Sequence, residues 1–268
     1  MHIPRKHAVV AFGLAGALLF GATSCSSSNG DSSGGSGDAA KAATWKVCSD
    51  VPFEPFEYPG KGPRGLTYTG FDIDLLDHLA KTQNATLDIR DTDFDTIVGA
   101  VNTGTCDVVA SAVPITDERK KDALFSDPYF DADQSLLIPV DSPVKTLDDL
   151  TGKTIGVQGG TPGESYAKGH TPEGATVRSF PDPAALFAAI DAGQIDAILQ
   201  DLAVNSERAA KDDAVKVIDT IPTGKLYGFM VAKDNTSLKK TLNAALAQAK
   251  NDGTYDKLYA RYFPNTGT

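Results

Sequence analysis

The feature that most constrains this chain is the alternation of short apolar runs with amphipathic segments from about residue 44 onward. Apolar runs bounded by polar residues indicate buried strands, and apolar residues three and four positions apart indicate helices. The predicted strands are 46–49, 87–90, 107–111, 154–158 and 195–200, and the predicted helices are 70–81, 95–103, 183–192, 238–251 and 255–263. This alternation is typical of an α/β fold in which parallel sheets are covered by helices.

Local signals mark several helix starts. Asp182 precedes Pro183, which is a favourable pairing of cap and first helical residue. Thr161 and Glu164 have the spacing of a capping box, in which the Glu164 carboxylate would accept the Thr161 amide proton. Asp72 lies in the first turn of the helix 70–81, where the helix dipole favours negative charge.

Two helix-to-strand connections follow one plan. In residues 103–109 and in residues 192–198, a helix ends at glycine and a turn of two residues follows. A strand with aspartate near its start comes next. Any two such connections can use glycine in this way. The alternative is that the chain holds two similarly built α/β domains, and both interpretations stay open at this point.

Polar residues gather where predicted strands end. Asp50, Ser111 and Asp201 end or follow three of the strands, and residues 159–162 follow Gln158 at the end of a fourth. Open α/β sheets bind ligands beyond the carboxyl ends of their strands. The sequence therefore predicts a ligand cleft at these positions.

The N-terminus predicts export. Arg5 and Lys6 precede an uncharged run over 8–22, which is shorter than the about 20 apolar residues that a membrane span needs. Residues 22–25 (ATSC) resemble a lipobox, in which Cys25 is lipidated. We therefore expect a signal peptide over 1–24 and attachment to the outer face of the cell membrane at Cys25, the alternative being an ordinary signal peptide with an incidental cysteine. The Ser- and Gly-rich residues 25–43 are expected to form a flexible tether.

Charge and rare residues exclude several classes of function. The formal charge of −10 becomes −12 when Arg5 and Lys6 leave with the signal, and this acidity disfavours nucleic acid. Beyond the signal only His78 and His170 remain, without a partner at metal-ligand spacing. We therefore expect no metal, no cofactor and no histidine-based catalytic triad.

Cys48 and Cys106 leave one question open. In an oxidising compartment they can pair. If their strands are parallel neighbours, however, the two Cα atoms can lie farther apart than the about 4.4–6.8 Å that a disulfide needs.

Several motifs, in order, are similar to family 3 extracellular solute-binding proteins, the polar amino acid receptors of ABC importers. They are GFDIDLL at 70–76, ITDERKK at 115–121, FSDPY at 125–129, GKTIGV at 152–157 and DGTYDKL at 252–258. The resemblance covers nearly all of the chain after the tether. It implies capture of an amino acid, delivery to a membrane permease, and a monomer without enzymatic activity.

The resemblance also implies a two-lobed, type II periplasmic-binding-protein-like fold, with each lobe a mostly parallel sheet flanked by helices. The first lobe would comprise 44–134 and 229–268, and the second 135–228. Two crossing strands near 134–137 and 227–230 would join them.

The same resemblance assigns roles to residues that would contact the ligand. Arg119 matches the arginine that binds the ligand's α-carboxylate, and its planar guanidinium suits that partner. Asp201 matches the carboxylate that receives the α-ammonium, and it also stands where it can cap the following helix. Because the two residues come from different lobes, a zwitterion would favour closure.

Other positions would shape the remainder of the site. Phe53 and Phe94 match apolar groups that sandwich the ligand, although either can be a core residue. The other matching positions are Asp50 and Gln158 near the ligand's side chain, Thr161 as a hydroxyl contact, and Ser111, Ala112 and Pro114 along one wall. Pro114 and Ala112 stand where many members carry hydroxyl groups, and Pro114 offers only its carbonyl. This departure leaves room for an unusual amino acid or another small cation.

Two other classes of function are weighed against binding. An enzyme on this fold would need an acid or base over the substrate, for which Glu54 and Asp50 are the candidates. A ligand sensor is the other alternative. A fused sensor would be expected to continue into a transmembrane helix, and the sequence ends at Thr268, so a stand-alone sensor is the form that stays open.

Overall fold

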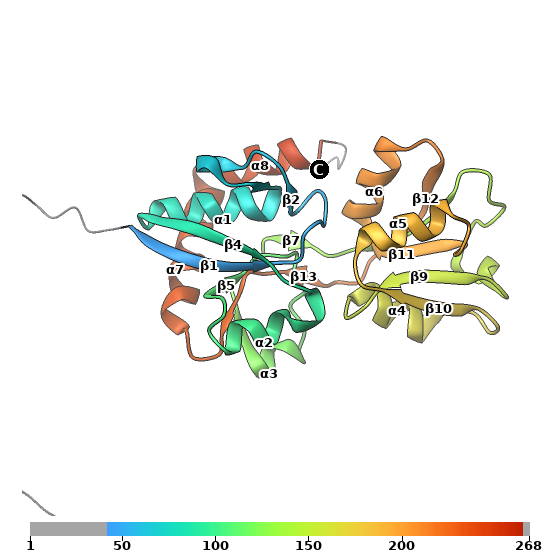
Figure 1. The fold of residues 1–268 in the computed structure, drawn as a ribbon, viewed down its shortest axis with the longest axis horizontal. Helices are drawn as coiled ribbons and strands as arrows, with labels where there is room; N and C mark the ends of the chain where they lie inside the picture. The colour runs from blue at the N-terminus through green and yellow to red at the C-terminus, as the bar shows by residue number, and fades with distance from the viewer. Residues whose placement is uncertain (1–41, 265–268) are drawn as a thin grey trace, which may run out of the picture. The chain divides into compact units, whose positions relative to one another are not determined.

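The structure is a computed structural model that describes residues 42–264, and these contain two five-stranded sheets with helices packed on them (Figure 1). The predicted signal peptide, Cys25 and residues 26–41 lie outside the described residues. The first strand begins at Ala43, the last residue of the expected tether. In residues 42–264, no helix combines the length and apolar character needed to cross a membrane.

The first sheet has the strand order β4-β1-β5-β14-β6. β1 (Ala43–Ser49) runs parallel to β4 (Ala85–Asp91) and to β5 (Val108–Val109). β14 (Met230–Ala232) comes from late in the chain and pairs antiparallel with β5 and with β6 (Ala123–Phe125). The sheet is therefore mixed, with its parallel strands on one side.

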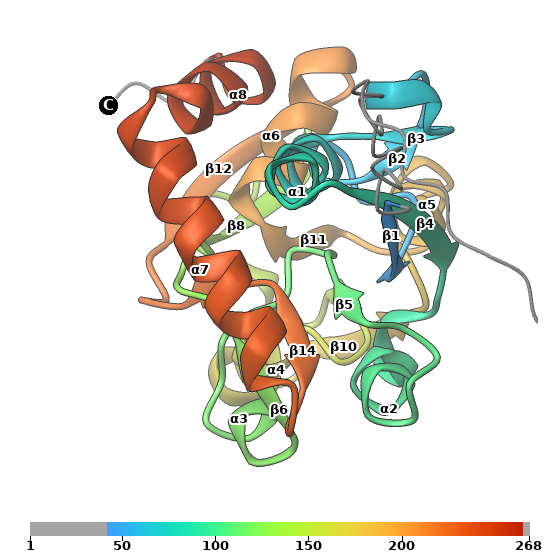
Figure 2. The same ribbon diagram turned by 90° about the vertical axis from the view of Figure 1, so that its left-hand side faces the viewer.

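Alternate residues of β1 pack on opposite faces of the first sheet, as strand geometry requires. Val47 belongs to the apolar cluster under α1 (Phe71–Thr82) and α7 (Thr236–Asn251). The next residue, Cys48, belongs to the cluster under α2 (Ile97–Asn102). Figure 2 shows these helices on the two sides of the sheet.

The second sheet has the order β10-β9-β11-β8-β12. β9 (Thr154–Gln158) is parallel to β10 (Thr176–Phe180) and β11 (Ala197–Asp201). β8 (Gln134–Pro139) is antiparallel to β11 and to β12 (Val215–Ile221). This sheet is also mixed, since β8 enters from the first lobe and runs against its neighbours.

Helices cover both faces of the second sheet. Leu136 lies in the cluster under α4 (Pro162–His170), and Leu137 lies in the cluster under α5 (Pro183–Asp191). α6 (Leu202–Lys211) follows β11 directly and contacts β8 and β12. The remaining elements are β2 (Tyr58–Pro59), β3 (Tyr68–Thr69), α3 (Arg119–Asp122), β7 (Phe130–Asp131), β13 (Leu226–Tyr227), α8 (Thr254–Tyr262) and the 3-10 turns Pro63–Gly65, Phe94–Thr96 and Leu147–Leu150.

The chain crosses between the two sheets twice, at adjacent places. β7 pairs antiparallel with β13, and beyond that pair the Ala132 amide donates to Lys225 O at 2.8 Å. Thr223 Oγ1 donates to Ala132 O at 2.9 Å. Because β8 already belongs to the second sheet, the outward crossing precedes Gln134, earlier than the expected 134–137. The division into lobes 44–134 plus 229–268 and 135–228 stays a prediction.

Helix capping follows the sequence signals with one difference. The Asp182 side chain accepts from the Ala185 amide at 2.8 Å, and Thr161 accepts from Glu164 at 3.3 Å. The Glu164 carboxylate is expected to accept from the Thr161 amide. It accepts instead from the Gly160 amide at 3.0 Å.

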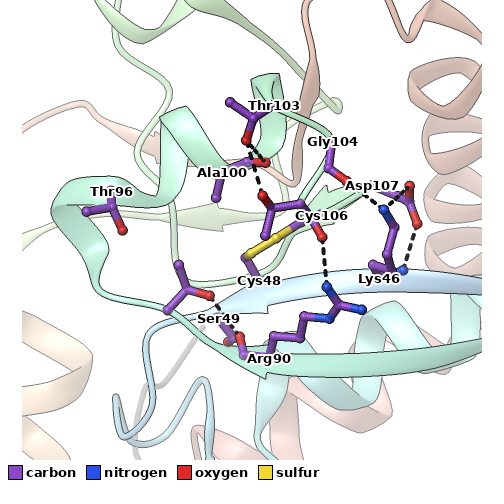
Figure 3. The surroundings of a disulfide bond; sticks show 12 residues. Lys46, Cys48, Ser49, Arg90, Thr96, Ala100, Thr103, Gly104, Cys106 and Asp107 are labelled. Carbon is purple, nitrogen blue, oxygen red and sulfur yellow. Dashed lines mark hydrogen bonds and ion pairs between the residues drawn. A yellow bond between two sulfur atoms is a disulfide. The ribbon is translucent and has the colours of Figure 1, made fainter.

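Cys48 and Cys106 form a disulfide, which answers the question that the sequence left open (Figure 3). Their Cα atoms are 5.7 Å apart. β1 and β5 are indeed parallel neighbours, but Cys106 lies in the turn before β5 rather than in the strand. The turn is held beside β1 by bonds in both directions, from Asp107 N to Lys46 O and from Lys46 N to the Asp107 carboxylate, each 2.8 Å long.

Candidate functional site

Residues from both sheets line a small cavity where their strands end. Within its bounds about 240 Å³ is not occupied by atoms, a figure that includes open solvent, and the enclosed part is only about 10 Å³, so the walls lie close together. It is lined by Asp50, Phe53, Phe94, Ser111, Ala112, Pro114, Gln158, Thr161, Pro162 and Asp201. The structure therefore brings together every residue matched to a ligand contact except Arg119. Of the predicted segment 159–162, Thr161 and Pro162 line the cavity and Gly159 and Gly160 do not. The carboxyl ends of β1, β9 and β11 meet there.

One end of the cavity holds Asp50, whose carboxylate spans the two lobes. Its Oδ2 accepts from Gln158 Nε2 at 2.7 Å, while its own amide donates to Ser111 Oγ at 2.9 Å. Burial raises the pKa of Asp50 from 3.8 to about 7; the Gln158 hydrogen bond opposes that rise, and the nearby carboxylates Asp91 and Asp182 add to it. This end of the cavity is thus acidic and partly protonated near neutral pH.

Asp201 forms the second acidic group of the cavity. Its Oδ1 accepts from Gln134 Nε2 and from the Tyr227 hydroxyl. Burial raises the pKa of Asp201 to about 6, although both hydrogen bonds and the charge of Arg119 oppose the rise. The side chain makes no capping bond to α6, so the alternative role of helix cap is not used.

Arg119 lies at the edge of the cavity, in the adjoining groove, which it shares with Phe94 and Thr161. Its Nη1 donates to Pro114 O at 3.2 Å and its Nη2 to Gly160 O at 3.1 Å. Its guanidinium carbon lies 5.0 Å from the centre of the Phe94 ring, within cation–π range. The guanidinium therefore joins the two lobes through backbone carbonyls, and desolvation lowers its pKa.

Residues of the apolar cavity wall also pack in the core or have a fixed conformation. Phe53 is buried, lines the cavity and stacks on Phe56 with ring centres 6.0 Å apart, so it is a core and a cavity residue at once. Ala112 has a φ of 42°, in the left-handed region that residues with a side chain rarely adopt. The Thr161 hydroxyl donates to Gln158 O at 2.8 Å, which fixes its orientation.

Sequence reasoning missed two residues that position Asp201. Gln134 is fully buried at the start of β8, and Tyr227 ends β13 and is 1 % exposed. Both lie where the chain crosses between the lobes, and both direct a donor at the same carboxylate oxygen. A glutamine or tyrosine at the end of a strand carries no local signal for such a contact.

The described residues give little support to a metal site or to catalysis by Glu54. Within 42–264 no group of three or more His, Cys, Asp or Glu side chains is arranged to hold a metal ion. Glu54, a candidate acid for an enzyme, is paired with Lys211 of α6 and does not line the cavity. Asp50 is the candidate that remains at the site.

Comparison with known proteins identifies relatives along nearly the whole described chain. Residues 45–265 match the profile of the bacterial extracellular solute-binding proteins, family 3. The "Probable histidine-binding protein" of Neisseria gonorrhoeae is 34% identical over 259 residues, covering 92% of this chain and 95% of the relative.

Solved structures of amino acid-binding proteins are also similar to this chain. An ancestral arginine-binding protein bound to arginine aligns with a TM-score of 0.75 and 36% identity, covering 83% of this chain and 99% of that one. The ancestral amino acid-binding protein AncCDT-1, a precursor of cyclohexadienyl dehydratase, aligns with a TM-score of 0.73 and 38% identity, covering 82% of this chain and 95% of that one.

The expected fold class is confirmed by these structures, since the α/β chain with its two sheet-bearing lobes is a type II periplasmic binding protein fold. The sheets are mixed rather than mostly parallel as expected, because β14 and β8 each run antiparallel to both of their neighbours. The family expected from the motifs is confirmed as well. The chain belongs to the bacterial extracellular solute-binding proteins of family 3.

Proposed function

We propose that this protein is the extracytoplasmic substrate-binding protein of an ABC importer, which captures an amino acid in the cavity between its lobes and delivers it to a membrane permease. The observation that carries this proposal is the cavity itself. It is formed by strand ends of both sheets, holds two carboxylates and has a guanidinium at its edge. A small zwitterion can satisfy both signs of charge there.

Arg119 and Asp201 are the proposed partners of the ligand's α-carboxylate and α-ammonium. The Arg119 guanidinium now donates to two neutral carbonyls at 3.1 and 3.2 Å. A carboxylate is a stronger acceptor and can take two parallel bonds from one guanidinium, so exchange of partners is favourable. The hydrogen bonds from Gln134 and Tyr227 both end on Asp201 Oδ1, so a cation would approach Oδ2.

The Asp50 end of the cavity favours a ligand with a cationic side chain. Asp91, Asp93 and Asp182 all raise the pKa of Asp50, so this end has a negative local field when Asp50 is ionised. A cation placed there would be attracted by several carboxylates. The names of the relatives, a histidine-binding protein and an arginine-binding protein, agree with such a ligand.

We further propose that the mature protein is a monomer attached to the outer face of the cell membrane through lipid on Cys25. Cys25 follows a short apolar run, and residues 26–37 are composed almost entirely of Ser, Gly, Asn and Asp. A polar coil of this composition would let the folded part hang from the membrane.

The binding proposal is tested with a panel of amino acids and thermal unfolding. We expect one amino acid, or a small related set, to raise the melting temperature of the purified protein. Ligand at 1,000 times its dissociation constant stabilises the folded state by about 4 kcal/mol. Native mass spectrometry of the freshly purified protein would show a ligand that co-purifies. If no member of the panel raises the melting temperature, the ligand class is wrong.

The pKa of Asp50 gives the binding proposal a pH dependence. A cationic side chain needs the ionised carboxylate, so affinity for L-arginine should fall as pH drops through about 7, by up to tenfold per pH unit. Affinity for L-glutamine, whose side chain is neutral, should change much less through this group. Titration calorimetry across this pH range measures both ligands. Asp50→Asn should remove the part of the arginine pH dependence near pH 7 and leave the part near pH 6 that Asp201 contributes for both ligands.

Asp50→Asn should weaken the binding of arginine but increase the stability of the folded protein at high pH. Because the folded state raises the pKa of Asp50, it binds the proton more tightly than the unfolded chain, and this contribution is lost as pH rises through about 7. Asp50→Asn should therefore melt at a higher temperature than the parent above pH 7 and show no such gain in acid. An arginine affinity that is unchanged by Asp50→Asn would remove Asp50 from the site.

A catalytic alternative has one supporting observation. Asp50 lines the cavity, and a carboxyl group with a pKa of about 7 suits general acid or base catalysis. AncCDT-1, the precursor of a dehydratase, shows that an amino acid-binding protein with this fold stands at the origin of an enzyme. Recovery of unchanged ligand after prolonged incubation with the protein would decide for binding, and its conversion would decide for catalysis.

A further inference from the structure

Two carboxylic side chains are buried directly behind the cavity wall. Glu57 and Asp72 are each 0 % exposed, and neither lines the cavity. A buried carboxyl group is costly unless its charge is compensated or neutralised. The proposed binding mechanism gives no role to either residue.

Each of the two carboxyl groups holds a residue of the cavity wall. Ser111 Oγ donates to Glu57 Oε1 at 2.8 Å, and the amide of Ala112 donates to Asp72 Oδ2 at 2.8 Å. The Tyr129 hydroxyl donates to the same Asp72 oxygen at 2.6 Å. Ser111 in turn accepts the amide of Asp50, so the contacts of Glu57 extend to the acidic end of the cavity.

The backbone holds the segments that carry the two carboxyl groups beside each other. The amide of Asp72 donates at 3.0 Å to the carbonyl of Phe56, the residue before Glu57. This approach depends on Gly70, which has a φ of 127° and where a Cβ would lie 2.1 Å from Phe56 O. The segment of GFDIDLL that carries Asp72 is thus fixed beside the segment that carries Glu57.

One oxygen of each carboxyl group has no hydrogen-bond partner, namely Glu57 Oε2 and Asp72 Oδ1. Two neighbouring carboxylates cannot both be ionised in a buried place, and a shared proton would satisfy both oxygens at once. Burial and the charge of Asp72 raise the pKa of Glu57 well above its usual value, and burial raises the pKa of Asp72 to about 7. The groups that surround the pair are themselves acidic or neutral: Asp50, Asp201, Tyr129 and Tyr227.

We propose that Glu57 and Asp72 share one proton between Glu57 Oε2 and Asp72 Oδ1, and that together they position Ser111 and Ala112 in the wall of the ligand site. The pair holds Ala112 in its left-handed conformation, because Asp72 binds the amide of that residue. The effect on ligand rests on the proposed function, whereas the shared proton does not.

A double-mutant cycle without ligand tests the shared proton. In Glu57→Gln the amide oxygen accepts from Ser111 and the amide nitrogen donates to Asp72. In Asp72→Asn the oxygen accepts from Ala112 and Tyr129 and the nitrogen donates to Glu57. Each single variant should therefore unfold close to the parent in denaturant titrations. The double variant sets two donors against each other, and its loss of stability should exceed the sum of the single effects.

The pH profile and the infrared spectrum provide readouts that a purely structural role would not change. Because the folded state raises the pKa of Glu57, the stability of the parent should fall as the shared proton is lost in alkali, whereas Glu57→Gln should keep its stability there. At a pH above the pKa values of Asp50 and Asp201, the parent should show the carbonyl band of a protonated carboxyl group. Glu57→Gln should lack it, because the buried group with the more strongly raised pKa is then absent.

Ligand binding tests the positioning role. L-Arginine, L-lysine, L-histidine and L-glutamine serve as probes in titration calorimetry. Glu57→Gln should bind the best of these within about threefold of the parent, and the double variant should bind it at least about tenfold more weakly. Asp74→Asn is the matched control on the same helix, since Asp74 binds Tyr262 and Arg261 and does not contact the cavity wall. It should lower stability and leave affinity unchanged.

The outcomes separate this proposal from the proposed function. Additive single effects, or a double variant more stable than the parent, would overturn the shared proton even if the amino acid panel succeeds. A panel without a ligand, together with a non-additive cycle, would overturn the proposed function and leave the shared proton standing. A double variant that binds like the parent would overturn the positioning role.

Discussion

Arg119→Ala is expected to weaken binding of the amino acid found in the panel by at least about 100-fold. Removing one partner of a desolvated charge pair costs about 2–5 kcal/mol, and 2.7 kcal/mol corresponds to about 100-fold. The loss should be seen as a missing thermal shift and as weak or absent heat in titration calorimetry. Arg119→Lys should also bind poorly, because an ammonium cannot make the two parallel bonds of a guanidinium.

The neighbouring Lys120 supplies the control for Arg119. Its ammonium group pairs with Asp117 at the exposed surface, so Lys120→Ala removes the same charge at nearly the same place without touching the cavity. Lys120→Ala should bind the ligand as the parent does. If Arg119→Ala binds with unchanged affinity while the protein stays folded, Arg119 is not the partner of the α-carboxylate.

Removal of the disulfide is expected to lower the free energy of unfolding by about 4 kcal/mol. Cys48 and Cys106 are separated by 58 residues, and closing a loop of this length removes much of the entropy of the unfolded chain. The measurement is chemical unfolding of the double variant Cys48→Ala and Cys106→Ala beside the parent. Alanine suits both sites because the two side chains are buried among apolar residues.

A reducing agent provides the internal control for the disulfide. The parent should lose a similar amount of stability when reduced, and the double variant should not respond. Ligand affinity should stay within a few-fold of the parent at temperatures where the variant is folded, since Cys48 faces α2 and does not line the cavity. Equal stability of the reduced and oxidised parent would contradict the entropic effect of the bridge.

The sequence predicts the cavity residues that lie at the ends of parallel strands. Asp50, Ser111, Gln158 and Asp201 follow strands, and the ends of those strands meet because parallel strands point their carboxyl ends the same way. The strand 154–158 is confirmed at its predicted bounds, and the helix 70–81 is confirmed to within one residue at each end. The roles of these residues toward a ligand stay predictions.

The sequence does not predict contacts that depend on distant partners. Asp72 is explained locally by the helix dipole, yet its side chain binds Ala112, which lies 40 residues further along the chain. Arg119 is found from a motif, but its bond to Gly160 O depends on how the second lobe faces the first. The predicted strand 107–111 is regular only over Val108–Val109, and the chain turns at Ala112 with a positive φ.

The double crossing between the lobes affects how reproducibly the two walls of the cavity are aligned. A single connecting strand would let the second lobe swivel freely. Two connections held side by side by bonds of 2.8 and 2.9 Å leave bending as the easy motion and resist twisting. In the proposed binding cycle, each closure would then bring Asp50 back to Gln158 and Arg119 back to Gly160. The alignment of the cavity walls would thus depend on contacts at the crossing, namely the β7–β13 pair and the two bonds beyond it, which lie outside the cavity.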